Sequence, residues 1–253
     1  MTFKLISALV ALSASSLFAA PVAVRTLDPI EVASPIEKIF IPEGFDDNDN
    51  IEVVLHGNFP NTCYTVGRAS ATVDNENHEI VVKATAYKYP GKLCLQSITP
   101  FIQTVTLGLL NEGNYTVRMA DKQNLQKEML VSKRKTESAD DYLYATVENA
   151  GLQIDADSGK QAVKLSGHFP YFFVGCMVLR DVKVKTAPSD VLVVQPIAEI
   201  VDNEECQNQP ADRSFEYTAG LTEAFRGEGL LHVRTLDGNS INRYINVDRN
   251  GLH

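Results

Sequence analysis

An internal repeat is the feature of this sequence that most limits how the chain can fold. Gly57-Asn58-Phe59-Pro60 aligns with Gly167-His168-Phe169-Pro170, and a cysteine follows each copy within a few residues. Further along, residues 113–131 align without a gap with residues 229–247. Two matches in the same order indicate a tandem duplication. Each half of the chain is therefore expected to form a copy of the same domain, which suits a length of 253 residues.

The four cysteines repeat together with the domains. Cys63 and Cys94 lie 31 positions apart, and Cys176 and Cys206 lie 30 positions apart. Four cysteines allow three pairings, and the duplication selects the pairing that keeps both partners in one copy. We predict the disulfides Cys63–Cys94 and Cys176–Cys206, each worth about 3 to 4 kcal/mol through the restricted unfolded chain. A metal–thiolate site is the alternative, but the sequence has no C-x-x-C pair.

Hydrophobic periodicity predicts an all-β fold. Apolar and polar residues alternate along residues 51–56, where Glu52 and His56 take polar positions, as in a half-buried strand. Similar runs recur between clusters of Gly, Pro, Asn and Asp, and Asp237-Gly238, like Asp121-Lys122 in the first copy, predicts a hairpin turn. We therefore expect two tandem immunoglobulin-like antiparallel β-sandwich domains with one disulfide in each.

The domain boundaries follow from the repeat and from local composition. Residues 1–20 combine one cation, an apolar run and an Ala-rich end, which is typical of a signal peptide, although a buried N-terminal helix is the alternative. The domains are expected at 36–132 and 142–248, joined by an exposed, charged linker at 133–141. The apolar run is too short to predict a membrane span. Export would place the chain in a periplasmic or secreted location, where disulfides persist.

Sequence motifs give no support for catalysis. The chain has no G-x-S-x-G, His78-Glu79 lacks the second histidine of H-E-x-x-H, and Ser132-x-x-Lys135 lies in the linker. An enzyme would need a site assembled by the fold, so we predict a protein that is not an enzyme and has no cofactor. The formal net charge of −9 argues against nucleic acid or an anionic bilayer as the main partner.

Two metal sites can be considered, and neither is predicted. His168, Cys176 and Met177 include copper-ligand types, but a cysteine in a disulfide provides no thiolate, and we expect the histidines at surfaces or turns. The acidic segments 46–50 and 155–159 offer hard oxygen ligands suited to calcium. Both lack the Gly and Glu of an EF-hand loop, and their residues are also those of ordinary turns.

The two copies differ most after the shared Phe-Pro. The first copy reaches its cysteine with two residues, whereas the second uses five, which include Tyr171, Phe172 and Phe173. Because aromatic residues are favoured anchors in protein interfaces, we assign these three to partner binding, with packing in the core or against the first domain as the alternative.

These features predict an exported, non-enzymatic binding or structural protein whose partner is another exported or cell-surface protein. An extracellular inhibitor or a carbohydrate-binding module is the second interpretation, and an enzyme with a fold-assembled site is the third. The absence of Trp weakens the carbohydrate interpretation. The layout resembles that of periplasmic pilus chaperones and secreted adhesion or coat proteins, a resemblance that concerns the fold class alone.

Overall fold

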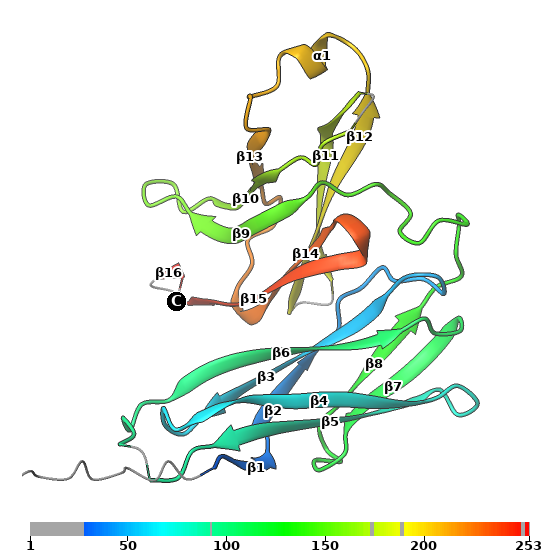
Figure 1. Cartoon of the computed structure of the whole chain (residues 1–253). Coiled ribbons are helices and arrows are strands. Elements are labelled where there is room, and N and C mark those ends of the chain that lie inside the picture. The colour runs from blue at the N-terminus through cyan, green and yellow to red at the C-terminus, as the bar shows by residue number, and fades with distance from the viewer. Residues whose placement is uncertain (1–27, 92, 173–174, 188–189, 249–250, 253) are drawn as a thin grey trace, which may run out of the picture.

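The chain forms two β-rich domains, one packed on the other (Figure 1). The predicted signal peptide, residues 1–20, lies outside the described part. The described residues contain no helix long and apolar enough to span a membrane. The computed structural model describes residues 28–91, 93–172, 175–187, 190–248 and 251–252.

Domain 1 is a sandwich of two sheets. One sheet has the strand order β2–β3–β6, and the other has the order β4–β5–β7–β8, with β1 sharing an edge of β5 with β7. The inward faces of both sheets enclose one core, which includes Ile39, Leu55 and Tyr115. The strands are β1 (Ile30–Ala33), β2 (Ile36–Phe40), β3 (Ile51–Phe59), β4 (Tyr64–Asp74), β5 (Glu79–Lys88), β6 (Thr99–Gly108), β7 (Gly113–Met119) and β8 (Gln126–Val131).

Domain 2 repeats this arrangement except that β1 has no strand counterpart and β16 is added. Its β9–β10–β13 sheet matches β2–β3–β6, and the β11–β12–β14–β15 part of its second sheet matches β4–β5–β7–β8. Tyr144 bridges to Ile197 in β12, so the chain around Tyr144 takes the place of β1. The strands are β9 (Val147–Ile154), β10 (Gln161–His168), β11 (Cys176–Ala187), β12 (Val191–Val201), β13 (Ser214–Gly220), β14 (Gly227–Thr235), β15 (Asn239–Asp248) and β16 (Gly251–Leu252).

The tandem β-sandwich prediction is confirmed, with one difference in strand direction. The pairs β5–β7 and β12–β14 are parallel, whereas the other strand pairs among the described residues are antiparallel. Residue alternation reports which face a side chain occupies and carries no information about strand direction. One sheet of each domain, which we expect to be antiparallel, is therefore mixed. The same parallel pair in both domains supports their common origin.

The glycine of the repeated Gly-x-Phe-Pro motif permits a close approach between strands. A Cβ atom on Gly57 would lie 2.3 Å from the carbonyl oxygen of Pro35, and one on Gly167 would lie 2.0 Å from that of Thr146. Both contacts are far inside van der Waals distance, so only glycine fits without a shift of the backbone. The register also shifts close to both sites.

The phenylalanine of the motif closes one end of each core. Phe59 stacks on Phe101 at a centroid distance of 4.0 Å, and Phe169 stacks on Phe215 at 4.5 Å. The partner ring comes from β6 in domain 1 and from the equivalent β13 in domain 2. Offset aromatic stacking adds to the burial of these large side chains. The motif therefore marks the same structural position in both domains.

Both predicted disulfides are present. Cys63 bonds to Cys94 with a Cα–Cα distance of 5.3 Å, and Cys176 bonds to Cys206 with a Cα–Cα distance of 5.5 Å. Each bond joins the start of a strand to the connection that follows the next strand, so each domain has its own staple at an equivalent end. The pairing that the duplication selects is confirmed.

The domains meet through the outer face of β2–β3–β6 and the outer face of β12–β14–β15. Phe40 and Val54 of domain 1 pack with Val191, Val193 and Leu230 of domain 2 in a separate buried cluster. As a result, β3 and β14 are buried on both faces along most of their length. An interface of this kind fixes one domain against the other.

This interface corrects one prediction from alternation. Residues 51–56 form a strand as expected, but Glu52 and His56 are only 7% and 3% exposed. Domain 2 covers the face that the periodicity assigns to solvent. The half-buried strand of an isolated domain is thus fully buried in the two-domain protein.

Candidate functional site

A buried polar network joins the two domains at one end of their interface. Glu52 accepts hydrogen bonds from Ser240 Oγ at 2.6 Å and from Asn242 Nδ2 at 2.7 Å. His232, which is 1% exposed, places Nδ1 2.9 Å from the Asn242 side-chain oxygen and 3.4 Å from Glu52 Oε1. Burial lowers the pKa of His232 to about 4, so its ring is neutral near pH 7. A neutral ring that donates from Nδ1 fits this set of acceptors.

Arg234 extends this network toward domain 1. Its guanidinium carbon lies 4.5 Å from the ring centre of Phe45, a cation–π contact. Its Nη1 lies 3.5 Å from Asp49 Oδ2 and 3.4 Å from the hydroxyl of Tyr144. Since Arg234 and Asp49 are almost completely buried, this ion pair is shielded from solvent and is costly to break.

The acidic segment 46–50 is a turn that holds the linker. Asp49 accepts the backbone N–H of Asp46 at 3.0 Å through Oδ2 and that of Asp140 at 3.2 Å through Oδ1. Asn48 donates to the carbonyl oxygens of Thr136 and Ser138 at 3.1 and 3.0 Å. Residues 133–139 are exposed, yet these hydrogen bonds tie the segment to domain 1. The polar atoms that suggested calcium here have structural partners.

The segments that suggested metals lack a ligand cluster. Within the described ranges, no group of three or more His, Cys, Asp or Glu side chains is arranged to hold a metal ion. His168 pairs with Glu148 at 3.0 Å, while Met177 is buried in a hydrophobic cluster. His168 and Met177 therefore lie in different surroundings, one beside an exposed carboxylate and the other in a hydrophobic cluster.

Two histidines correct the expectation that histidines lie at surfaces or turns. His56 stacks on Tyr244 of domain 2 with ring centres 4.0 Å apart and planes 4° apart. Burial lowers the pKa of His56 and raises the pKa of Tyr244 to about 12, so both rings are neutral at physiological pH. His56 and His232 are therefore two titratable histidines inside the interface.

The described part of the aromatic insertion of domain 2, Tyr171 and Phe172, lies between β10 and β11. Tyr171 is 73% exposed, and the guanidinium carbon of Arg213 lies 4.4 Å from its ring centre. Phe172 is half-buried against the hydrophobic cluster of Phe169. Phe173 lies outside the described residues. The loop thus presents Tyr171 to solvent and uses Phe172 for packing.

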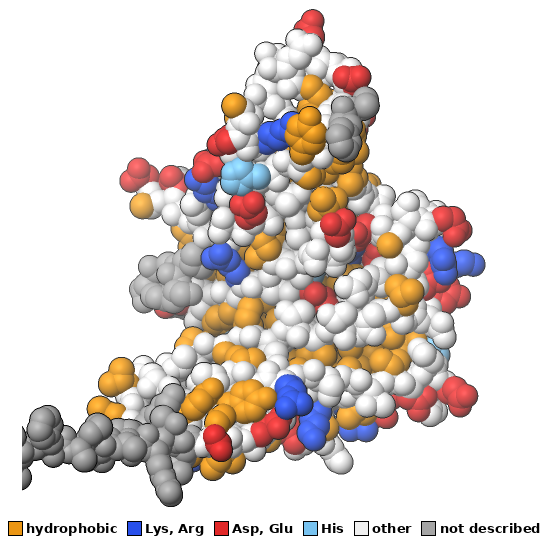
Figure 2. All heavy atoms as spheres, viewed as in Figure 1, with side chains coloured by type: hydrophobic (Ala, Val, Ile, Leu, Met, Phe, Trp, Pro, Cys, Tyr) orange, Lys and Arg blue, Asp and Glu red, His pale blue; other side chains and the backbone are white. Residues whose placement is uncertain are grey.

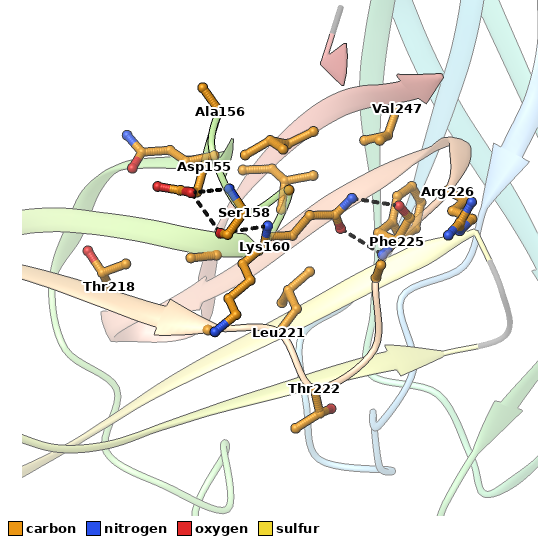
Figure 3. Close-up of a pocket in the computed structure, with 18 of the residues that line it drawn as sticks. Asp155, Ala156, Ser158, Lys160, Thr218, Leu221, Thr222, Phe225, Arg226 and Val247 are labelled. Atoms are coloured by element: carbon orange, nitrogen blue, oxygen red, sulfur yellow. Dashed lines mark hydrogen bonds between the residues drawn. The ribbon is translucent and has the colours of Figure 1, made fainter. Parts of the chain in front are cut away.

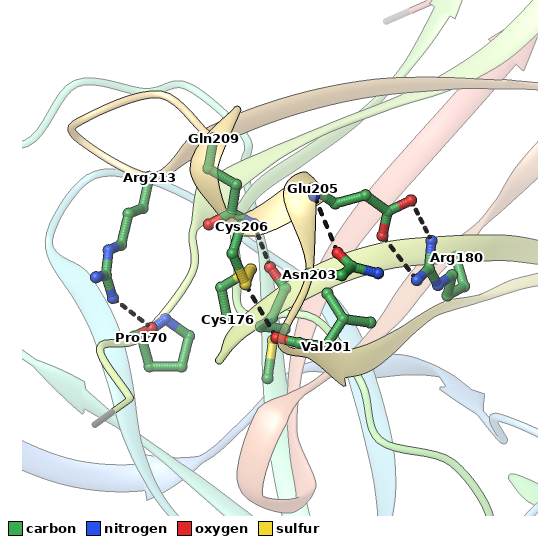
Figure 4. Close-up of a disulfide and its surroundings, with 10 residues drawn as sticks. Pro170, Cys176, Arg180, Val201, Asn203, Glu205, Cys206, Gln209 and Arg213 are labelled. Carbon is green, nitrogen blue, oxygen red and sulfur yellow. Dashed lines mark hydrogen bonds and ion pairs between the residues drawn. A yellow bond between two sulfur atoms is a disulfide. The ribbon is translucent and has the colours of Figure 1, made fainter. Parts of the chain in front are cut away.

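The second disulfide lies beside this loop, and polar contacts brace its surroundings (Figure 4). Helix α1 (Glu204–Gln207) carries Cys206, and Asn203 caps it by accepting the N–H of Glu205 at 2.9 Å. Arg180 of β11 binds Glu205 through two hydrogen bonds of 3.1 and 2.8 Å. Arg213 donates to the carbonyl oxygen of Pro170 at 3.1 Å. The disulfide and these hydrogen bonds therefore link β11, α1 and the segments next to Tyr171 to one another.

A wide cleft lies elsewhere in domain 2, next to the β9–β10 hairpin (Figure 3). It holds about 1960 Å³, and its lining includes Asp155, Lys160 and Phe225. Gln161 crosses its floor, where it accepts the N–H of Phe225 at 2.7 Å and donates to the Phe225 carbonyl at 2.9 Å. Hydrogen bonds from Ser158 lower the pKa of Asp155, which makes that carboxylate a weak base.

Comparison with known proteins supports the fold. Residues 53–129 match the model of a family described as the ORF11 beta-sandwich domain. Domain 1 is similar to this family over β3 to β8. The matched segment covers less than half of the chain, and the family description states an architecture without an activity. Comparisons with curated proteins and with solved structures give no match.

Sequence reasoning missed one exposed group of hydrophobic side chains. Leu93, Leu95 and Ile98 are 99%, 68% and 71% exposed on the loop that carries Cys94. Hydrophobic side chains reach the surface at this end of domain 1 (Figure 2). The signal was available, because Leu93-Cys94-Leu95 places two large apolar residues beside a cysteine whose own side chain must turn inward to its disulfide.

Proposed function

We propose that this chain is an exported, non-enzymatic binding or structural protein that acts through contacts with another exported or cell-surface protein. The exposure of Tyr171 at 73% on a braced loop is the observation that carries this proposal. Large, exposed aromatic side chains with few rotatable bonds are effective anchors, since little entropy is lost when they bind.

Rigidity supports this function. Arg213 supports the first end of the loop, because it lies over the Tyr171 ring and donates a hydrogen bond to the Pro170 carbonyl. The disulfide at Cys176 holds the loop's far end. The two domains form one body through their buried interface. A partner would therefore meet a preformed surface, with Tyr171 as the contact and Phe172 as its support.

Export is part of the proposal and rests on residues 1–20 and the two disulfides. Disulfides persist in oxidising compartments. N-terminal sequencing of the mature protein should find a start next to Ala19 or Ala20. A mature protein that begins at Met1 would contradict export through this segment.

Site-specific photo-crosslinking tests the contact. A photoreactive phenylalanine analogue replaces Tyr171 in one variant and Tyr217, which is 42% exposed on β13, in a matched control. We expect a single adduct in the exported fraction from position 171 and none from position 217. Unlabelled protein should compete for this adduct, and the Tyr171→Ser variant should not. Equal adducts at both positions, or competition by Tyr171→Ser, would contradict the assignment.

A further inference from the structure

The loop of residues 93–98 in domain 1 carries exposed apolar side chains on both sides of a disulfide-bonded cysteine. Its exposed side chains alternate around a tethered residue, since Leu93 and Leu95 point outward while Cys94 is half-buried and bonded to Cys63. Leu93 is 99% exposed and therefore makes almost no packing contact within the chain. The loop follows β5 in domain 1, whereas Tyr171 follows β10 in domain 2.

Two residues next to Leu93 attach to the neighbouring Thr62-Cys63 segment. Thr62 donates its N–H to the Leu95 carbonyl at 3.2 Å, and its hydroxyl accepts the Leu95 N–H at 3.0 Å. Cys94 forms its disulfide with Cys63, whose carbonyl also accepts the N–H of Tyr89 at 2.9 Å. Cys94 and Leu95 are therefore held in place before any partner arrives, which lowers the entropy lost on binding.

This geometry selects a concave partner. A flat surface would cover only one side of the protruding Leu93, whereas a cleft with an apolar pocket would enclose it and recover its burial energy. Since the Leu95 backbone is already bonded to Thr62, Leu93 is the best placed side chain to act as the primary anchor. Ile98, which is 71% exposed, extends the apolar contact.

We propose that residues 93–98 bind in the substrate cleft of a secreted serine protease whose primary specificity pocket is apolar, with Leu93 in that pocket. Such proteases receive an extended segment along the cleft and sort partners by one side chain. A stapled loop that fills the cleft and stays ordered blocks the enzyme, as in the tight complexes of proteases with protein inhibitors. The oxidising compartment that preserves the disulfides is where secreted proteases act.

Inhibition assays with purified full-length mature protein test the proposal. The probes are chymotrypsin and subtilisin, which have apolar primary pockets, and trypsin, whose pocket is acidic. We expect inhibition of at least one of the first two at micromolar concentration or below. Leu93→Ala should weaken it about 30-fold or more. Leu93→Arg should move inhibition toward trypsin. Leu130→Ala is the matched control, because Leu130 is 61% exposed on β8, away from the loop.

Three results would overturn the inference: no inhibition of either apolar-pocket protease, inhibition unchanged in Leu93→Ala, or rapid cleavage of the loop without inhibition. Sedimentation that shows a dimer lost in Leu93→Ala would instead identify a second copy as the occupant. Thermal unfolding checks that each variant folds. Tyr171 takes no part in this contact, so failure here and failure of the crosslinking at Tyr171 are separate outcomes.

Discussion

Acid should weaken the contact between the domains through His232. The pKa of this ring is about 4 in the folded protein against 6.5 in an unfolded chain, because burial disfavours the charged form. The unfolded state therefore binds the proton first. The stability contributed by the neutral ring is complete above pH 6.5 and is lost as the pH falls toward 4. The difference of 2.5 pKa units corresponds to about 3 kcal/mol.

Neighbouring titratable groups change the size of this loss of stability in acid but not its sign. Burial also lowers the pKa of His56, which adds to the loss in acid. Glu52 opposes the loss by attracting the charged His232 ring, while Arg234 favours the neutral ring. Burial raises the pKa of Asp46 and Asp140, so protonation of these carboxyl groups in acid offsets part of the effect. A comparison with a variant isolates the histidine from these carboxyl groups.

The assay is urea unfolding near pH 7 and near pH 4 for the wild type and His232→Asn. Asn retains a side-chain donor but does not titrate in this range. We expect the wild type to lose about 3 kcal/mol more than the variant between the two pH values. His168→Asn is the control, because the His168 side chain is half exposed outside the interface. The same pH dependence in wild type and His232→Asn would refute the reasoning.

The remaining predictions concern the staples, the motif glycine and the assembly state. Reduction of both disulfides should lower the free energy of unfolding by about 3 to 4 kcal/mol per bond, measured by urea unfolding with and without reductant. Gly167→Ala should destabilise the protein by about 2 kcal/mol or more, because its Cβ would meet a carbonyl oxygen. Gly151→Ala in neighbouring β9, where the Cβ would meet open space, should change thermal stability little. The wild type should sediment as a monomer.

The repeat and the cysteines are strong predictors because each constrains the chain locally. The repeated spacing of Cys63 to Cys94 and of Cys176 to Cys206 predicts the disulfide pairing. The alternation of apolar and polar residues predicts the strands. Strand direction in β5–β7 is different, since a side chain points to the same face whether its neighbour runs parallel or antiparallel. The exposure of Leu93 also depends on the three-dimensional course of the loop.

The periodicity of the sequence does not predict the contact between the domains. The alignment of the two repeats does contain a signal for it. Leu230 and His232 occupy the positions that Asn114 and Thr116 hold in the first copy. These are outward positions of equivalent strands, and the change to larger or less polar residues in the second copy marks the face that domain 1 covers. Comparison between copies carries information that the periodicity of one copy lacks.

One aligned arginine shows how docking changes a conserved position of the repeat. Arg118 pairs with Glu79 on a partly exposed face of domain 1. Its counterpart Arg234 is buried, and its ion pair reaches Asp49 in the other domain. The residue and the strand position are the same, and the difference lies in the surroundings of Arg234, where Phe45 and Asp49 of domain 1 contact it.

The contact between the domains joins unlike faces, and such contacts can propagate into filaments. In a filament, the outer face of β10 would replace that of β3 and meet the outer face of β7. Lys164 and Ser166 stand there in place of Val54 and His56, and Asn114 stands in place of Leu230. These polar groups would lose water without the apolar contact that compensates in the existing interface.

The double variant Lys164→Val, Asn114→Leu restores both apolar positions, so we expect it to associate with rising concentration in sedimentation. A wild type that associates equally would show that these polar groups do not limit assembly.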